Sequence, residues 1–571
     1  GNELRLAHLV DGLLAALRAQ RSLPRASAQL ALPPASQPPQ GTQLTATTPP
    51  SSLTSPGTTV VEATQASGVW GPDVSLGTSV WDFACAVQRI SRFDLKDRHQ
   101  AFWDEVSDFV AAYASTLTVR ELAVFCNAYG MGAPSRLSGP LHDAVARRAA
   151  ELAGDLTPKD LTMIMHGLSR CGSIEEAKTA NPVPIRALAW RARKIWLEKD
   201  RPQQTALLLS AFARLRHDRD AALYRRLFNF ARKNLHYWDS QSLSLLCRSY
   251  AMVEPVSRSQ LDPQGWAAIA ARCSEVLQNA SGRQLGYMAH ALASVNAPPE
   301  SLTEFYAMLE EFLVARPRVN EHLNAQDIVQ IATGLTWHHC ALLAGQQQFK
   351  PTGLPATTWP LEEHAARRLR EFTPQGLAYI LDAAVWLGRG GAPFFRALAV
   401  ELRHRQSKLS GRALAVTTRA AAAALASRDG LGGQAVALLR DLQPACLRVA
   451  PMLTLPQVAA IVEAYAEATS GRARQDGLET RMPRAFFKWP DSDAALKFLR
   501  EICVRTKEQG PNSIGHLEKV CVASRQILEA EEFAPAAVAS HLAYLGCQAQ
   551  IEAKPGCAPS EDLVLPEGSS Q

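Results

Sequence analysis

The stretch LTPKDLTMIMHGLSRCG, residues 156–172, contains a lone histidine, and its pattern of residues recurs along the chain. LTVRELAVFCNAYGMG (117–132), DSQSLSLLCRSYAMV (239–253) and TPQGLAYILDAAVWLG (373–388) share it. Each has a Ser, Thr or Asp at its first or second position that can cap a helix. An apolar or small residue follows after four positions, another after three, and an Ala, Gly or Ser after three more. His166 therefore belongs to a repeated column, which argues against a catalytic role.

The small residue of this pattern occurs at ten positions that are 37 to 49 residues apart. A near-constant period of this length is typical of repeat proteins. The positions are Ala86, Ala128, Gly167, Ala211, Ser249, Ala291, Gly334, Ala383, Ala420 and Ala464. The spacing predicts an all-α fold, an α-solenoid of about ten helix–turn–helix repeats of roughly 40 residues.

Each repeat also contains a second amphipathic stretch, such as 141–154, 221–235 and 266–278. One helical hairpin cannot bury its own apolar face, but a stack of hairpins can. We expect the small-residue column to let neighbouring first helices approach closely. Pro158 and Pro374 stand in the first turn, where the N–H that proline lacks has no helical partner.

The composition divides the chain into five parts. We expect an amphipathic helix at 1–20, a Pro/Ser/Thr-rich linker at 21–74, the repeat array at 75–470, a helical cap or degenerate repeats at 471–550, and a tail at 551–571. Helices are predicted at 491–506, 514–529 and 533–547. Residues 470–490 read as a polar connector, and no stretch has a persuasive strand pattern.

Motifs for catalysis or metal binding are weak. His338, His339 and Cys340 lack a second ligand pair at zinc-like spacing, and the glycine-rich stretches 388–393 and 430–433 follow helices, unlike phosphate-binding loops. We therefore expect a non-enzymatic protein without catalytic residues, metal, cofactor or small-molecule substrate. No apolar run approaches a membrane span. The eleven cysteines contain no Cys-x-x-Cys pair, and we interpret them as buried thiols of a reducing compartment.

Positive charge is concentrated in two parts of the array. Residues 186–233 contain thirteen Lys and Arg against four Asp and Glu, and residues 365–419 contain ten against three. Such clusters on repeat helices favour contacts with RNA phosphates, although a solvated helix face has the same pattern. The candidate RNA-binding residues are Arg186, Arg191, Arg193, Lys194, Arg225, Arg226, Arg232, Lys233, Arg367, Arg368, Arg370, Arg403 and Arg405.

The first helices contain a further pattern. A polar residue precedes most members of the small column, as in Arg248, His290 and Asp382, and another polar residue stands seven positions earlier. Since positions seven apart share a helical face, we predict a continuous polar–small–polar surface. Base-reading repeat proteins use such a surface, but simple solvent exposure gives the same polarity.

The units LTPKDLTMIMHGLSRCG and LTVRELAVFCNAYGMG resemble the repeats of organellar RNA-binding solenoids over about 75–470. These are the octotricopeptide and heptatricopeptide types and the related arrays of mitochondrial RAP-domain proteins. The resemblance implies a mitochondrial, RNA-binding protein. The expected function is that of a structural ribosomal protein, which binds rRNA together with other proteins of a large ribonucleoprotein assembly. An RNA-processing or stability factor, or a protein-interaction scaffold of another mitochondrial complex, is the alternative.

Overall fold

The computed structural model describes most of residues 80–541, together with residue 12. The longer gaps within that range are 93–99, 171–181, 254–260, 317–321, 346–359, 426–430, 482–491, 504–513 and 531–537. The helix expected at 1–20, the linker, the last predicted helix at 533–547 and the tail therefore fall outside the described residues, apart from single positions.

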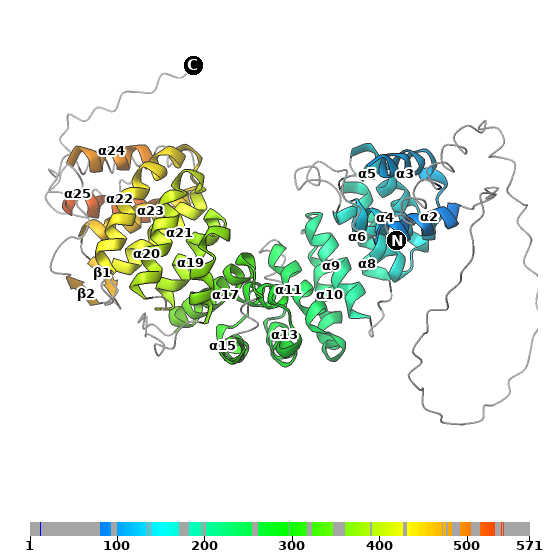
Figure 1. The fold of residues 1–571 in the computed structure, drawn as a ribbon, viewed down its shortest axis with the longest axis horizontal. Helices are drawn as coiled ribbons and strands as arrows, with labels where there is room; N and C mark the ends of the chain where they lie inside the picture. The colour runs from blue at the N-terminus through cyan, green and yellow to red at the C-terminus, as the bar shows by residue number, and fades with distance from the viewer. Residues whose placement is uncertain are drawn as a thin grey trace, which may run out of the picture. The chain divides into compact units, whose positions relative to one another are not determined.

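The chain forms two compact units, residues 1–191 and 192–571, and the boundary lies in the last turn of helix α8. The described helices of the first unit follow one another along the chain (Figure 1). They are α2 (Val80–Ile90), α3 (Gln100–Tyr113), α4 (Val119–Gly132), α5 (Gly139–Glu151), α6 (Pro158–Arg170) and α8 (Pro182–Lys194).

The second unit continues the same alternation of helices. Its helices are α9 (Pro202–Arg214), α10 (Ala221–Lys233), α11 (Ser240–Met252), α13 (Pro263–Val276), α14 (Gly282–Ser294), α15 (Thr303–Ala315), α17 (Ala325–Gly345), α18 (Pro360–Arg367), α19 (Pro374–Trp386), α20 (Ala392–His404), α21 (Gly411–Leu425), α22 (Gly432–Val449), α23 (Leu455–Ser470), α24 (Ser492–Ile502) and α25 (Ile514–Ala530).

The helices pack in two layers. In the second unit the first helices α9, α11, α14, α17, α19, α21, α23 and α25 contact each other in that order, and α10, α13, α15, α18, α20, α22 and α24 form the other layer. In the first unit α2, α4 and α6 pack in sequence in the same way. This confirms the predicted all-α fold built from helical hairpins that stack in chain order.

The small-residue column lies where successive first helices meet. A Cβ atom on Gly167 would lie 2.1 Å from the carbonyl oxygen of Cys126 on the preceding first helix, and one on Gly334 would lie 2.5 Å from that of Ala289. Ala128, which belongs to the same column, is fully buried. The prediction that small residues allow close approach of the helices is confirmed.

The predicted caps are also present. Thr118 and Glu121 form a reciprocal capping box at the start of α4, and the Asp239 carboxylate accepts the Ser242 N–H at the start of α11. Thr373 accepts the Gly376 N–H while Pro374 occupies the first turn of α19. Short 3₁₀ turns such as Ala153–Asp155 and Gln406–Lys408 end many second helices and lead into the next repeat.

Two expectations about the C-terminal part are wrong. The polar connector contains an antiparallel hairpin, β1 (Arg472–Gln475) with β2 (Leu478–Arg481), where no strand was predicted. The two strands, RARQ and LETR, contain almost no apolar residues, so the alternation that indicates a strand is missing. The second wrong expectation is that every cysteine is a thiol, because Cys521 is disulfide-bonded. The described cysteines from Cys85 to Cys503 do carry free thiols.

Candidate nucleic-acid interface

Several arginines predicted to bind RNA hold the turn at the start of their own repeat. Arg191 donates from Nε and Nη2 to the Leu156 carbonyl oxygen, at 3.2 and 2.7 Å. Arg405 donates from Nη1 to the Phe372 carbonyl at 2.5 Å and from Nη2 to the Arg370 carbonyl at 2.9 Å. Leu156 and Phe372 are the buried residues directly before the helix caps. We call this contact the arginine clamp.

Arg368 makes the same bond to the Leu323 carbonyl and also pairs with Glu371. Arg226 donates from Nη2 to the Ile195 carbonyl at 2.8 Å. Each clamp spans between 31 and 45 residues of sequence. It connects the second helix of a pair with the segment that leads into the first helix, so it stabilises the hairpin.

Two arginines outside the two basic stretches of the sequence also form an arginine clamp. Arg148 donates from Nε to the Leu117 carbonyl at 3.1 Å, and Arg272 donates from Nε to the Trp238 carbonyl at 3.2 Å. A glutamate three residues later pairs with the guanidinium in both cases. The Arg-x-x-Glu pattern at the end of a second helix could therefore have identified these arginines as structural from the sequence.

A second group of predicted RNA-binding residues forms ion pairs, most of them with an acidic residue of the next repeat. Arg232 lies 2.7 Å from Asp262, and Arg403 lies 2.6 Å from Asp441. The remaining two pairs are Arg193 with Asp220 at 3.7 Å and Arg367 with Glu363 at 2.5 Å. Arg186, Lys194, Arg225, Lys233 and Arg370 are exposed.

The two basic stretches of the sequence do not form one continuous strip in the second unit. In the second-helix layer their residues lie on α10 and on α18 and α20, and α13 and α15 are packed between these helices. Helix α15 carries Glu304, Glu310 and Glu311. A polyanion that followed this layer would therefore meet an acidic helix halfway.

The first helices present a different surface. The eight polar residues at their first turns are all exposed, and they are Arg120, Lys159, Gln203, Gln241, Arg283, Gln326, Gln375 and Arg412. Among the residues seven positions later, Arg248 and Arg419 are also exposed, while Thr333 and Asp382 are buried.

The prediction that small residues lie at the surface between the two polar positions is wrong. The small residues meant are Ala123, Thr162, Ala206, Ser244 and Gly286. Ser244 and Gly286 are buried, and a Cβ on Gly286 would meet Gln330 of the next first helix. A helix turns about 100° per residue, so positions three and four after the first polar residue lie on opposite sides of the stripe. The third position faces the neighbouring helix, and the fourth, occupied by Tyr287 or Tyr379, reaches the surface.

Cationic and aromatic side chains on this surface contact each other from one first helix to the next. The Arg248 guanidinium of α11 lies 4.4 Å from the ring centre of Tyr287 on α14, and that of Arg412 on α21 lies 5.8 Å from Tyr379 on α19. The rings of His290 on α14 and Trp337 on α17 are 5.1 Å apart.

The same surface includes an ion pair between α19 and α21. Arg419 donates to both carboxylate oxygens of Asp382, at 3.0 and 2.8 Å. We call the residues Arg248, Tyr287, His290, Trp337, Tyr379, Asp382, Arg412 and Arg419 the aromatic–arginine ladder.

Burial controls the ionisation of two ladder residues. It lowers the pKa of His290, and the nearby positive charge of Arg412 lowers it further, so the imidazole is neutral at neutral pH. Burial raises the pKa of Asp382, and the Arg419 guanidinium partly offsets this. The ladder therefore presents three guanidinium groups and three aromatic rings, and one of the guanidinium groups, that of Arg419, is paired with Asp382.

Other kinds of site find little support in the described residues. No group of three or more His, Cys, Asp or Glu side chains is arranged to hold a metal ion among them. The His338 ring instead stacks on Tyr306 at 4.3 Å. No helix in the described part of the chain has the length and apolarity that a membrane crossing requires.

The fold and this surface define an all-α helical-repeat protein. No model of a known protein family matches the chain, and no curated protein is significantly similar to it. The class of protein is therefore defined by its architecture alone, a stack of helical hairpins.

Proposed function

We propose that the protein is a non-enzymatic RNA-binding solenoid and that the aromatic–arginine ladder of the second unit is its main contact surface. The ladder itself carries this proposal. Guanidinium groups pair with phosphates, and aromatic rings stack on unpaired bases. Contacts that repeat across α11, α14, α17, α19 and α21 suit a single strand running along the helices.

The ladder supports this function better than the second-helix arginines do. Arg191, Arg226, Arg368 and Arg405 are bonded to backbone carbonyls of their own repeat. Arg248 and Arg412 instead lie over aromatic rings on exposed helix faces. A base that stacked beside such a ring would bring its phosphate close to a guanidinium.

A pair of matched triple variants tests which surface binds. The ladder variant combines Arg248→Gln and Arg412→Gln of the ladder with Arg283→Gln, an exposed first-turn residue of the same surface. The control combines Arg367→Gln, Arg370→Gln and Arg403→Gln. Each triple variant removes three positive charges from exposed positions. Binding of a fluorescent single-stranded RNA is followed by anisotropy from about 50 to 200 mM salt.

We expect the ladder variant to bind more weakly, and the slope of log affinity against log salt to shrink by about 2, or about 0.7 for each phosphate that the protein no longer neutralises. The control should bind as the wild type does. If instead only the control binds more weakly, the interface lies on the second helices. Wild-type affinity that does not change with salt would reject a phosphate-based interface.

We further propose that the bound RNA is ribosomal and that the protein is a structural component of the mitochondrial ribosome. The resemblance of residues 156–172 and 117–132 to organellar RNA-binding repeats supports this. The native protein should sediment with a ribosomal subunit and leave that fraction after ribonuclease treatment. Sedimentation with smaller RNA particles would favour a processing or stability factor.

A protein-interaction scaffold is the second candidate, and helix α15 favours it. The side chains of Met308 and Val314 are 39% and 59% exposed on this helix, and Glu304 and Glu311 are exposed near them. A mixed apolar and acidic surface suits a protein partner better than RNA. A scaffold would sediment with its partner before and after ribonuclease treatment.

A further inference from the structure

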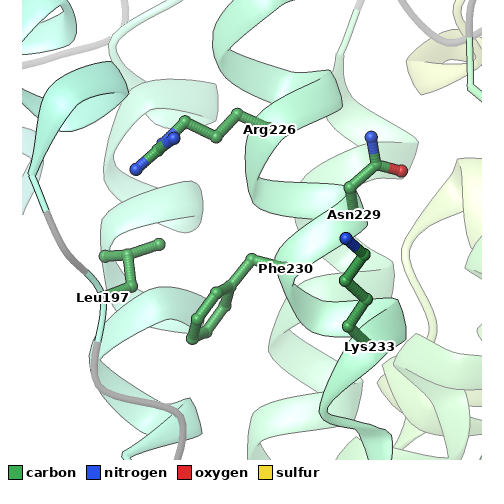
Figure 2. A pocket seen from close by; sticks show the side chains of 5 residues that line it. All are labelled: Leu197, Arg226, Asn229, Phe230 and Lys233. Atoms are coloured by element: carbon green, nitrogen blue, oxygen red, sulfur yellow. The ribbon is translucent and has the colours of Figure 1, made fainter.

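A pocket of about 360 Å³ lies in the second unit between α10 and the segment before α9 (Figure 2). Its lining residues are Leu197, Arg226, Asn229, Phe230 and Lys233. Figure 2 shows Arg226 and Phe230 projecting from α10 towards the segment that carries Leu197. Ligand pockets for small molecules begin at about 300 Å³, so this pocket has room for one planar group.

The aromatic residue of the pocket, Phe230, is not part of the buried face of α10. Helix α10 buries Leu223, Tyr224, Leu227, Phe228 and Ala231 against its neighbours, and these residues complete its apolar face. Phe230 stands outside this set and is half-buried.

The polar residues of the pocket are held around this ring. The bond from Arg226 Nη2 to the Ile195 carbonyl is 2.8 Å long and fixes the guanidinium at one side of the pocket. Lys233 is exposed and lies two helical turns further along α10. Asn229, between them, supplies an amide that can both donate and accept hydrogen bonds.

The chemistry of the lining identifies the occupant. The lining surface is mostly apolar, with a ring and a leucine that favour a flat apolar group. Lys233 favours negative charge beside that group, and none of the lining residues that the structure describes is acidic. The surrounding segment, residues 186–233, has thirteen basic and four acidic residues. A nucleotide combines these features, since its base can stack on an aromatic ring while its phosphate meets the lysine.

We propose that the α10 pocket binds one unstacked base of an RNA strand, with Phe230 as the stacking surface, Asn229 at the edge of the base, and Lys233 at the flanking phosphate. This site rests on the RNA-binding function proposed above, but it lies on the second-helix layer and is separate from the ladder. It would capture a bulged or terminal nucleotide.

The test uses the full-length protein with Phe230→Ala, Phe230→Tyr and Lys233→Gln, and Lys408→Gln as the matched charge control. Circular dichroism melting confirms that each variant folds. The probes are a fluorescent single-stranded oligonucleotide, the same strand with its bases removed, and free adenosine monophosphate. Photo-crosslinking of 4-thiouridine RNA followed by mass spectrometry locates the contact.

We expect Phe230→Ala to weaken binding of the oligonucleotide about tenfold, the effect of losing one base stack, and Phe230→Tyr to preserve it. Lys233→Gln should reduce the salt slope by about 0.7, and Lys408→Gln should leave binding unchanged. The strand without bases should bind the wild type and Phe230→Ala equally, and a crosslink should fall on the peptide that contains Phe230.

Equal binding of the oligonucleotide by Phe230→Ala and the wild type would overturn the pocket, and ladder-dependent binding would then leave the proposed function intact. If the wild type binds no RNA, the function fails. Binding of adenosine monophosphate that depends on Phe230, without binding of the strand, would make this a site for a free nucleotide and overturn the RNA assignment. Phe230-dependent binding of an acidic aromatic peptide in place of RNA would also overturn it.

Discussion

The close approach of first helices makes Gly167→Ala a sensitive probe of the solenoid. The new Cβ would lie 2.1 Å from the Cys126 carbonyl oxygen, at least 0.9 Å inside the 3.0 Å below which such contacts essentially do not occur. The obstacle is backbone, which cannot rotate away, so α4 and α6 must move apart. Overpacking of this kind costs about 1–3 kcal/mol and occasionally more.

Alanine also gains about 1 kcal/mol over glycine within a helix. Because the clash is severe, we expect a net loss of about 2 kcal/mol in the free energy of unfolding. The described helical part of the first unit lies within residues 80–191. At roughly 4 °C per kcal/mol for a helical unit of about that size, the first unit should melt about 8 °C lower. Differential scanning calorimetry measures this shift.

The control is Gly433→Ala, where the added Cβ meets nothing within 4 Å in helix α22. This variant should be as stable as the wild type or up to about 1 kcal/mol more stable. Gly334→Ala, whose Cβ would lie 2.5 Å from the Ala289 carbonyl oxygen, should lower the melting temperature of the second unit. A Gly167→Ala protein as stable as the wild type would refute the packing argument.

Two further perturbations test the clamp and a buried histidine. Arg272→Met removes the guanidinium that donates hydrogen bonds to the Trp238 and His236 carbonyl oxygens. The free energy of unfolding should therefore fall by about 1–3 kcal/mol. Arg367→Met, which removes only an exposed pair with Glu363, should change it by less than about 0.5 kcal/mol. Equal losses in chemical denaturation would contradict a special role for the clamp. Burial lowers the pKa of His338 to about 4, so the unfolded chain takes up a proton that the folded chain resists, and stability should decline as pH falls from about 6.5 to about 4. In His338→Phe, which keeps a ring beside Tyr306, the decline should be shallower; an unchanged pH profile would show that His338 does not titrate on unfolding.

The sequence was sufficient for the repeat because its determinants are local. A cap such as Thr118, an apolar stripe and a small residue such as Ala128 all lie within a dozen residues of one another. The close contact at Gly167 follows directly from the small column. The hairpin of β1 and β2 was missed because its pairing depends on backbone hydrogen bonds that short polar segments do not reveal.

The candidate site was less predictable because it depends on which side of each helix faces a neighbour. Periodicity places Arg283 and His290 on one face of α14 but cannot decide whether Gly286 or Tyr287 lies between them at the surface. Only the direction of the next helix decides this. The contacts of Tyr287 and Tyr379 with arginines 33 to 39 residues away are likewise invisible in a single helix.

The arginine clamp also changes what the basic stretches mean. Arginine-rich helices favour RNA when the guanidinium groups face solvent, but a planar guanidinium is equally suited to donate two parallel bonds to carbonyl oxygens, which a lysine ammonium cannot do in this geometry. Arg405 donates in that way to the Phe372 and Arg370 carbonyls, and both bonds of Arg191 meet at the single Leu156 carbonyl oxygen. Folding therefore accounts for part of the arginine content of residues 186–233 and 365–419. The case for RNA then depends on cations that the hairpins do not need, those of the ladder and Lys233 beside the α10 pocket.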